Sequence, residues 1–172
     1  MKVPGKTEAI TRWMSEDHAR LDGLLQQALA DPASIDMEPY GEFRSGLLRH
    51  IGIEEKILLP AAQRARGGVA LEAAARLRLD HGAVVALLVP TPTPAILATI
   101  RDILEDHNAL EESTDGLYAT CDRLLAGEIE SLVQEMAAYP EPRVNPHNDG
   151  PDVMRAVGRA LERAGYCLLS GT

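Results

Sequence analysis

Four of the five histidines in this chain recur at similar intervals, and each falls within its own long helical pattern. They are His18, His50, His81 and His107. Intervals of 32, 31 and 26 residues separate them, and each interval is roughly one long helix plus its turn. Helices joined by short turns alternate in direction, so all four histidines are expected at a similar depth in one bundle.

Proline and glycine punctuation divides the chain into helical segments. The predicted long helices cover 7–29, 36–60, 69–89 and 94–126. A short helix (128–139), a proline-rich loop (140–151) and an amphipathic helix (152–165) follow. Alternating β-branched runs are absent from the sequence, so no strands are expected. The predicted fold is all-α: an up-down-up-down four-helix bundle with one or two short C-terminal helices.

The composition is that of an ordinary soluble globular protein. The length of 172 residues suggests one domain (1–172), with a core bundle over about 7–126 and a C-terminal appendage at 127–172. The net charge of −9 argues against a phosphate-binding surface, so no nucleic-acid partner is expected. The opening "MKVPGKTEAI" lacks the apolar stretch of a signal peptide, and no run is long enough to span a membrane. We therefore expect a cytoplasmic protein without a membrane partner.

Two of the four histidines are followed by a glutamate four residues later. His50 precedes Glu54 in "HIGIEE", and His107 precedes Glu111 in "HNALEE". Residues four apart share a helix face, so each pair can offer two ligands to one point. With the histidines of the other two helices, the set would suit two transition metals that share carboxylates. Mixed nitrogen and oxygen donors favour iron, manganese or zinc over calcium or magnesium.

Each piece of this pattern also has an ordinary explanation. A single histidine on an apolar helix face is more often a core or surface residue than a ligand. A single H-x-x-x-E is a common surface contact. The metal-site interpretation depends on the joint pattern, with one histidine in each long helix and the same glutamate offset in two of them.

Four segments resemble the haemerythrin-like (HHE cation-binding) family over residues 10–126: "DHARLD", "RHIGIEEKILLP", "LDHGAVV" and "DHNALEESTDGLY". The resemblance implies a four-helix bundle with a non-haem di-iron site. It also implies a role for each candidate ligand. The terminal ligands would be His18, His50, His81 and His107, and the bridging ligands would be Glu54 and Glu111.

The chain departs from the oxygen-carrying members of that family on the third helix. Those members have a second histidine there, whereas Leu77 and Val85 lie four residues before and after His81 in this chain. One metal is therefore expected to lack a protein ligand and to hold water, hydroxide or an exogenous molecule. This departure favours redox reactivity, sensing or iron handling over reversible oxygen carriage.

Two further residues are candidates for supporting the site. Asp22 lies four residues after His18 and could hydrogen-bond a ligand or bind metal itself. Tyr118 lies seven residues after Glu111 and could donate a hydrogen bond to a bridging carboxylate. A surface carboxylate and a core tyrosine remain the ordinary alternatives for these two positions.

Several other carboxylates are sequence neighbours of the candidate ligands. Glu55 and Glu112 are turned about 100° from the glutamates they follow, so we expect them to be solvated or to support a ligand rather than bind metal. Asp17, Asp80 and Asp106 each precede a histidine and are expected to face away from the site by the same argument.

The leading hypothesis is a cytoplasmic di-iron protein that senses, binds or buffers iron, oxygen or nitric oxide. One alternative is a di-iron oxidoreductase acting on peroxide, oxygen or nitric oxide. Another is a structural metal site, holding zinc as readily as iron, in an interaction module. The expected partners are a diatomic ligand or peroxide, and a homodimer is left open.

Overall fold

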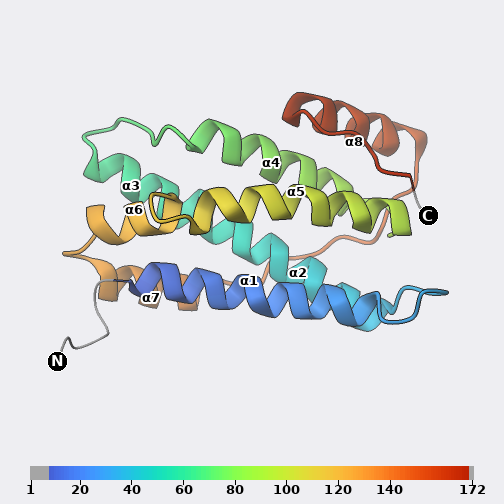
Figure 1. Ribbon diagram of the computed structural model, residues 1–172, viewed down its shortest axis with the longest axis horizontal. Coiled ribbons are helices and arrows are strands. Elements are labelled where there is room, and N and C mark those ends of the chain that lie inside the picture. The colour runs from blue at the N-terminus through green and yellow to red at the C-terminus, as the bar shows by residue number, and fades with distance from the viewer. Residues whose placement is uncertain (1–7, 171–172) are drawn as a thin grey trace.

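The protein is all-α in a computed structural model that describes residues 8–170 (Figure 1). No strand occurs within that range. Residue 7, the predicted start of the first helix and of the bundle, lies outside the described residues. The helices are α1 (Ala9–Ala28), α2 (Met37–Ile53), η1 (Glu54–Leu58), α3 (Leu59–Ala65), α4 (Ala74–Leu87), α5 (Pro94–Glu112), α6 (Leu117–Leu124), α7 (Ile129–Ala138) and α8 (Pro151–Ala164).

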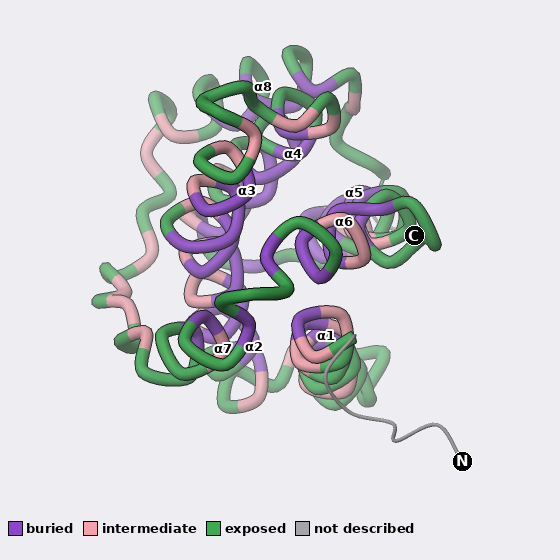
Figure 2. Tube along the Cα trace, turned by 90° about the vertical axis from the view of Figure 1, so that its left-hand side faces the viewer, coloured by how far each residue is buried: buried purple, intermediate pink, exposed green. Residues whose placement is uncertain are grey.

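Four long rods alternate in direction and form the bundle (Figures 1 and 2). The rods are α1, the continuous run of α2, η1 and α3, then α4, and finally α5. Side chains cap the N-termini of two of these rods, since Asp36 accepts from the backbone N–H of Glu38 and Thr93 accepts from that of Ile96. The predicted up-down-up-down bundle is confirmed.

Two separate apolar cores fill the bundle, one toward each end. The Phe43 core contains Leu25, Phe43 and Leu97 among its buried side chains. The Tyr118 core contains Met14 and Tyr118. The buried polar residues discussed below come from positions between these two cores along the rods, so a polar layer interrupts the apolar interior.

The second rod contains a π-helical segment that the sequence reading did not anticipate. The helix continues past Pro60, but residues Glu54–Leu58 are wound as a π-helix, and the N–H of Leu59 bonds to the carbonyl of Glu54. Pro60, two residues after this segment, has no N–H with which to continue the α-helical ladder, and single-turn π-segments within α-helices are frequent at functional sites. The segment begins at one of the candidate metal ligands.

The fourth long helix is shorter than predicted. The expected helix over 94–126 is interrupted after Glu112, and α6 begins only at Leu117. At Gly116 a Cβ atom would lie 2.4 Å from the carbonyl oxygen of Glu111, so only glycine fits this close turn. The third helix likewise begins at Ala74 rather than near residue 69.

The predicted C-terminal helices are present and lie outside the four rods (Figure 2). α8 packs against α4 and contributes Val157 and Leu161 to the Phe43 core. Arg44 fastens the loop before α8, since its guanidinium donates to the carbonyls of Leu88 and Asn145. Within residues 8–170, no helix combines the length and apolar character needed to cross a membrane.

Candidate metal centre

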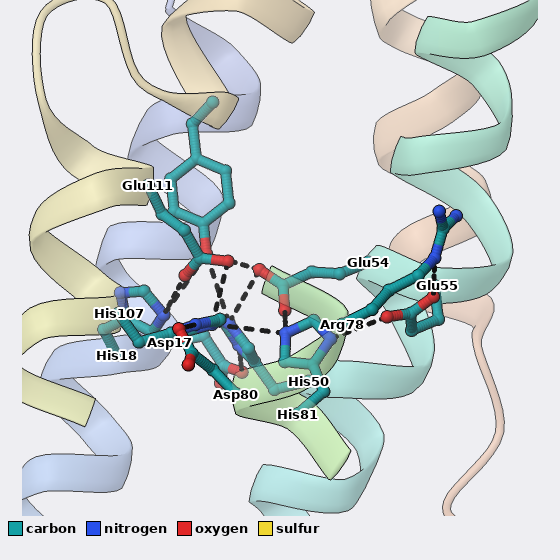
Figure 3. Close-up of polar contacts among 11 residues, drawn as sticks. Asp17, His18, His50, Glu54, Glu55, Arg78, Asp80, His81, His107 and Glu111 are labelled. Carbon is teal, nitrogen blue, oxygen red and sulfur yellow. Dashed lines mark hydrogen bonds and ion pairs between the residues drawn. The ribbon is translucent and has the colours of Figure 1, made fainter. Parts of the chain in front are cut away.

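All six predicted ligands are brought together in the polar layer between the two cores (Figure 3). His18 comes from α1, His50 from α2 and His81 from α4. Glu54 begins η1, while α5 supplies His107 and Glu111. Both glutamates are fully buried, and His18, the most accessible of the six, is only 9% exposed.

The ligands form two groups that share both glutamates. In each group the donor atoms lie within 4.8 Å of one another. The first group is His18, His50, Glu54 and Glu111, and the second is His81, His107, Glu54 and Glu111. Each group therefore offers two imidazoles and two carboxylates. The two donor sets are equal and neither contains a third histidine, so the expectation that one metal lacks a protein ligand and holds water, hydroxide or an exogenous molecule stays a prediction.

Each glutamate faces one histidine of each group through the imidazole Nε2 atoms. The four contacts are His50 Nε2–Glu54 Oε1 at 3.4 Å, His81 Nε2–Glu54 Oε2 at 3.1 Å, His18 Nε2–Glu111 Oε2 at 3.4 Å and His107 Nε2–Glu111 Oε1 at 3.1 Å. A carboxylate with one oxygen toward each group has the arrangement of a bridging ligand between two metal ions.

Two carboxylate oxygens in this centre are left without a hydrogen-bond partner among the described residues. Glu54 Oε2 and Glu111 Oε1 are buried, and the imidazole nitrogens 3.1 Å away do not meet them with hydrogen-bond geometry. An unsatisfied buried carboxylate oxygen is costly, and a cation between oxygen and nitrogen would remove that cost. Both oxygens face the second group, so they fit a cation held there, and the equal set of donors in the first group could hold a second ion.

Each histidine also contacts a carboxylate through its other ring nitrogen, Nδ1. We call the four carboxylate residues in these contacts the outer carboxylates. The contacts are His18–Glu112 at 2.5 Å, His50–Asp17 at 2.8 Å, His81–Glu55 at 2.7 Å and His107–Asp80 at 3.3 Å. A neutral imidazole that donates from Nδ1 leaves the Nε2 lone pair free for a metal, so these contacts orient the ligands.

The expectation that Asp17 and Asp80 face away from the site was wrong. Both are largely or fully buried against a histidine of a neighbouring helix. A turn of about 100° around a helix in a bundle points a side chain at the adjacent helix rather than at solvent. Asp106 is exposed as expected, and Glu55 and Glu112 support histidines, which is one of the two roles expected for them.

Three of the four outer carboxylates also form an ion pair with an arginine. Arg20 lies 2.8 Å from Asp17, Arg76 lies 2.8 Å from Asp80, and Arg78 lies 3.1 Å from Glu55. Within the described part of the chain, no arginine pairs with Glu112. That carboxylate is also the most exposed of the four, at 39%.

The Tyr118 hydroxyl lies between the two glutamates on the side of the Tyr118 core. It is positioned to donate to Glu54 Oε1 at 2.6 Å or Glu111 Oε2 at 2.9 Å. It also lies 3.2 Å from His18 Nε2 and 3.3 Å from His50 Nε2, both in the first group. Burial, reinforced by the charges of the two glutamates, raises the pKa of Tyr118 well above its usual value.

Without metal, protons take the place of the cations. Burial lowers the pKa of His50, but the charge of Glu54 and the hydrogen bond to Asp17 outweigh this and raise it to about 10. His107 behaves alike: against the effect of burial, Asp80 and Glu111 raise its pKa to about 10. Burial raises the pKa of Glu54, yet the facing histidines hold it well below its usual value. A metal must displace these protons to bind.

A cavity of about 300 Å³ adjoins the centre on the side of the Phe43 core. The four histidines and Glu54 line its inner wall, and Asp22 lies at its exposed edge. Asp22 accepts a hydrogen bond from Gln26 at 2.6 Å and belongs to neither ligand group. Neither Leu77 nor Val85 lines the cavity, since Leu77 lies in the Tyr118 core and Val85 is 37% exposed.

The outer carboxylates are the site residues that the sequence did not predict correctly or fully. Asp17 and Asp80 were expected to face away, and two roles were left open for Glu55 and Glu112. A signal for them exists in the sequence: each is the direct neighbour of a ligand, in the doublets Asp17–His18, Glu54–Glu55, Asp80–His81 and Glu111–Glu112. The doublet alone is not sufficient, because Asp106 also precedes a ligand and is exposed.

Comparison with protein families gives one match. The family model described as "Hemerythrin HHE cation binding domain" matches residues 9–119, a range that contains all six ligands and Tyr118. Neither the curated proteins nor the solved structures gave a match.

Proposed function

The chain belongs to the haemerythrin HHE cation-binding family, and from this premise we propose that it is a non-haem di-iron protein. In this proposal each ligand group would hold one iron ion, and Glu54 and Glu111 would be ligands common to both groups. The protein then senses, binds or buffers iron, oxygen or nitric oxide. Zinc and manganese are the competing metals for the same donor set.

The observation that carries this proposal is the sharing of both glutamates by two otherwise separate histidine pairs. Six ligands exceed what one ion needs, and a second ion uses the donors that the first leaves over. Two buried carboxylate oxygens without hydrogen-bond partners among the described residues both face the second group, and they support an ion in that group.

The protein's own groups have distinct tasks in this proposal. The outer carboxylates fix the imidazole orientation, and the Tyr118 hydroxyl donates a hydrogen bond to one of the two shared carboxylates. The cavity lets a small molecule reach the histidines. When bound, the iron ions supply the redox and ligand-binding chemistry.

Metal analysis tests the proposal directly. Protein made in iron-replete cells is expected to carry about two iron ions per chain, one for each group. An oxo-bridged ferric pair absorbs in the near ultraviolet, whereas a zinc pair does not. One ion or fewer per chain after reconstitution, with the six ligands intact, would overturn the dinuclear assignment.

A di-iron oxidoreductase is the second candidate, and the placement of Tyr118 favours it. A hydroxyl 2.6 Å from a bridging carboxylate can supply a proton during turnover of peroxide, oxygen or nitric oxide. Peroxide added to the iron-loaded protein separates the two functions. Many turnovers per chain indicate an enzyme, and a stoichiometric spectral change indicates binding or sensing. A purely structural metal site is less favoured, because a metal that only joins helices has no need of an adjoining cavity.

A further inference from the structure

The Tyr118 hydroxyl contacts a donor atom of every residue in the first ligand group. It lies 2.6 Å from Glu54 Oε1 and 2.9 Å from Glu111 Oε2. It also lies 3.2 Å from His18 Nε2 and 3.3 Å from His50 Nε2. These four residues are the whole of the first group. The hydroxyl therefore meets the donor atoms that the group would offer to an ion.

The hydroxyl and an ion would compete for these atoms. A neutral imidazole that donates from Nδ1 has a single lone pair at Nε2, and a metal ion needs that lone pair. Zinc bonds to imidazole nitrogen and carboxylate oxygen are about 2.0–2.2 Å long, so an ion held by all four atoms would crowd a hydroxyl that is in hydrogen-bond contact with each of them. An ion can enter the first group only by displacing the Tyr118 hydroxyl.

The second group has no such occupant among residues 8–170. Glu54 Oε2 and Glu111 Oε1 face it without a hydrogen-bond partner, and the Nε2 atoms of His81 and His107 lie 3.2 Å apart. An ion bound here would relieve two unsatisfied oxygens and displace no hydroxyl. The same types of donor should therefore bind a cation more tightly in the second group than in the first.

A shift of the tyrosine need not move the ligands of α5. Tyr118 is the second residue of α6, and the break after Glu112 separates α6 from α5, which carries His107 and Glu111. The tyrosine is fully buried in the Tyr118 core, so its hydroxyl has no water to bond to when it leaves the first group. Displacement therefore leaves the metal ligands in place but has an energetic cost.

We propose that the two groups bind metal in order, the second group first, because the Tyr118 hydroxyl closes the first group until an ion displaces it. Tyr118 is then a positioning residue that sets the relative affinity of two equal donor sets. This inference rests on the two metal positions of the proposed function. It gives the protein a one-ion form at low metal concentration and a two-ion form at higher concentration.

Calorimetric titration of the metal-free full chain with zinc tests the role of the tyrosine, since zinc binds the same donors without redox chemistry. Repulsion between two ions also separates two binding steps, so the informative quantity is how that separation changes in a variant. Tyr118→Phe should tighten the second step about five- to thirtyfold, which corresponds to the hydrogen bonding that the ion no longer displaces, and change the first step less. Tyr40→Phe, which removes a buried hydroxyl in the Phe43 core, should change neither step.

A matched pair of histidine variants identifies the group that binds first. His18→Ala removes an imidazole from the first group only and should retain the tight step of the wild type. His81→Ala removes one from the second group only, and its tightest step should be about five- to thirtyfold weaker than that of the wild type. This pair tests the order even if Tyr118→Phe does not fold. Equal tight steps in the two histidine variants would overturn the inference.

The near-ultraviolet absorption of Tyr118 gives a readout in the wild type. Taken as the difference between the wild type and Tyr118→Phe, it responds to the hydrogen bonding of this one hydroxyl. The signal should stay constant through the first equivalent of zinc and shift during the second. A shift that is complete after the first equivalent would overturn the order.

The outcomes separate this inference from the proposed function. Two bound ions with an unchanged second step in Tyr118→Phe would overturn the inference and leave the dinuclear assignment intact. A weaker second step would do the same, because the tyrosine would then be a ligand rather than a competitor. One ion in the wild type and two in Tyr118→Phe would support the inference and remove the dinuclear assignment from the native protein. One ion in both would overturn both.

Discussion

The two ligand groups offer the same donors but lie in different surroundings. In the first group, both histidines lie within 3.3 Å of the Tyr118 hydroxyl, and the outer carboxylate of His18 is 39% exposed. In the second group, neither histidine has a hydrogen-bond contact with a tyrosine among residues 8–170, and Asp80, the outer carboxylate of His107, is only 1% exposed. Arg76 holds Asp80 at 2.8 Å.

Under the proposed di-iron assignment, this difference separates the parts of the centre that would act on both metals from those that would act on one. The glutamates are common to the two groups, so a change there should affect both ions alike. The outer carboxylates and Tyr118 are specific to one side. The second group should accordingly be the more rigidly held, because its outer carboxylates are both paired with arginines.

The largest effect is expected from the shared glutamates. Glu54→Ala and Glu111→Ala each remove a donor from both groups, so each should lower the content of both metals. A ligand that binds only the folded chain stabilises it, and loss of tight binding should cost about 3 to 4 kcal/mol of metal-dependent stability. Elemental analysis and melting curves with and without iron measure the two effects.

Asp106→Ala is the matched control for these substitutions, since Asp106 is exposed and adjoins His107 in the sequence. The metal content of Glu55→Ala should lie between that of the glutamate-ligand variants and that of Asp106→Ala, because Glu55 contacts His81 without being in either group. Normal metal content in Glu54→Ala together with loss in Asp106→Ala would show that the ligands lie on another helix face.

The second prediction concerns pH and applies to both groups, because His50 and His107 each have a pKa of about 10 in the metal-free protein. A histidine with a raised pKa stabilises the fold fully below its ordinary value of 6.5, and this contribution is lost as the pH rises through about 10. Glu54, with a lowered pKa, stabilises above 4.5 and loses that contribution as the pH falls. The metal-free protein should be most stable between about pH 4.5 and 6.5.

The loss of folding stability at alkaline pH should amount to about a few kcal/mol in the metal-free protein. It should be absent from the iron-loaded protein, because metal binds neutral imidazole. Melting temperatures measured across pH with chelator and with iron give the comparison. A metal-free protein whose melting temperature stays constant from pH 6.5 to 10 would contradict the coupling of histidines and glutamates.

The fold and the convergence of the six predicted ligands were accessible from the sequence because both depend on local periodicity. The i, i+4 offset of His50 and Glu54 needs only a helix, and one histidine per rod needs only alternating helices. The break at Gly116 depends on a close backbone contact with Glu111, and the π-helix at Glu54–Leu58 is a local change of winding within a continuous helix. Neither has a periodic signature.

The outer carboxylates were harder to predict because they act between helices. A helical wheel places Asp80 about 100° from His81, but it does not show that another rod occupies that direction. The same limitation explains Val85, which the i, i+4 rule places near His81 although it is exposed in the bundle. To predict contacts between rods, the rotation of each helix about its own axis must be known. The sequence pattern determines that rotation only coarsely.

The third prediction compares one outer carboxylate from each group. Asp80→Asn should weaken metal binding about 10- to 100-fold, since the residue is buried against His107 and orients it. Glu112→Gln should weaken it by less than about tenfold, because Glu112 is partly exposed and water can replace its contact with His18. Competition with a metal chelator measures both affinities. A larger loss for Glu112→Gln would reverse the order of rigidity proposed for the two groups.

The smallest effect is expected from the tyrosine that marks the first group. Tyr118→Phe removes a hydroxyl that contacts both buried glutamates, and it should lower the free energy of unfolding of the metal-free protein by about 1 to 2 kcal/mol. Tyr40→Phe is the matched control, because the Tyr40 hydroxyl is buried without a hydrogen-bond partner among the described residues, and its removal should be neutral or slightly stabilising. Denaturant unfolding gives both values.

In Tyr118→Phe, the histidine NMR signals should move more for His18 and His50 than for His81 and His107, since only the first pair touches the hydroxyl. Equal shifts in all four would mean that Tyr118 acts through the shared glutamates, and that the two groups differ only in their outer carboxylates.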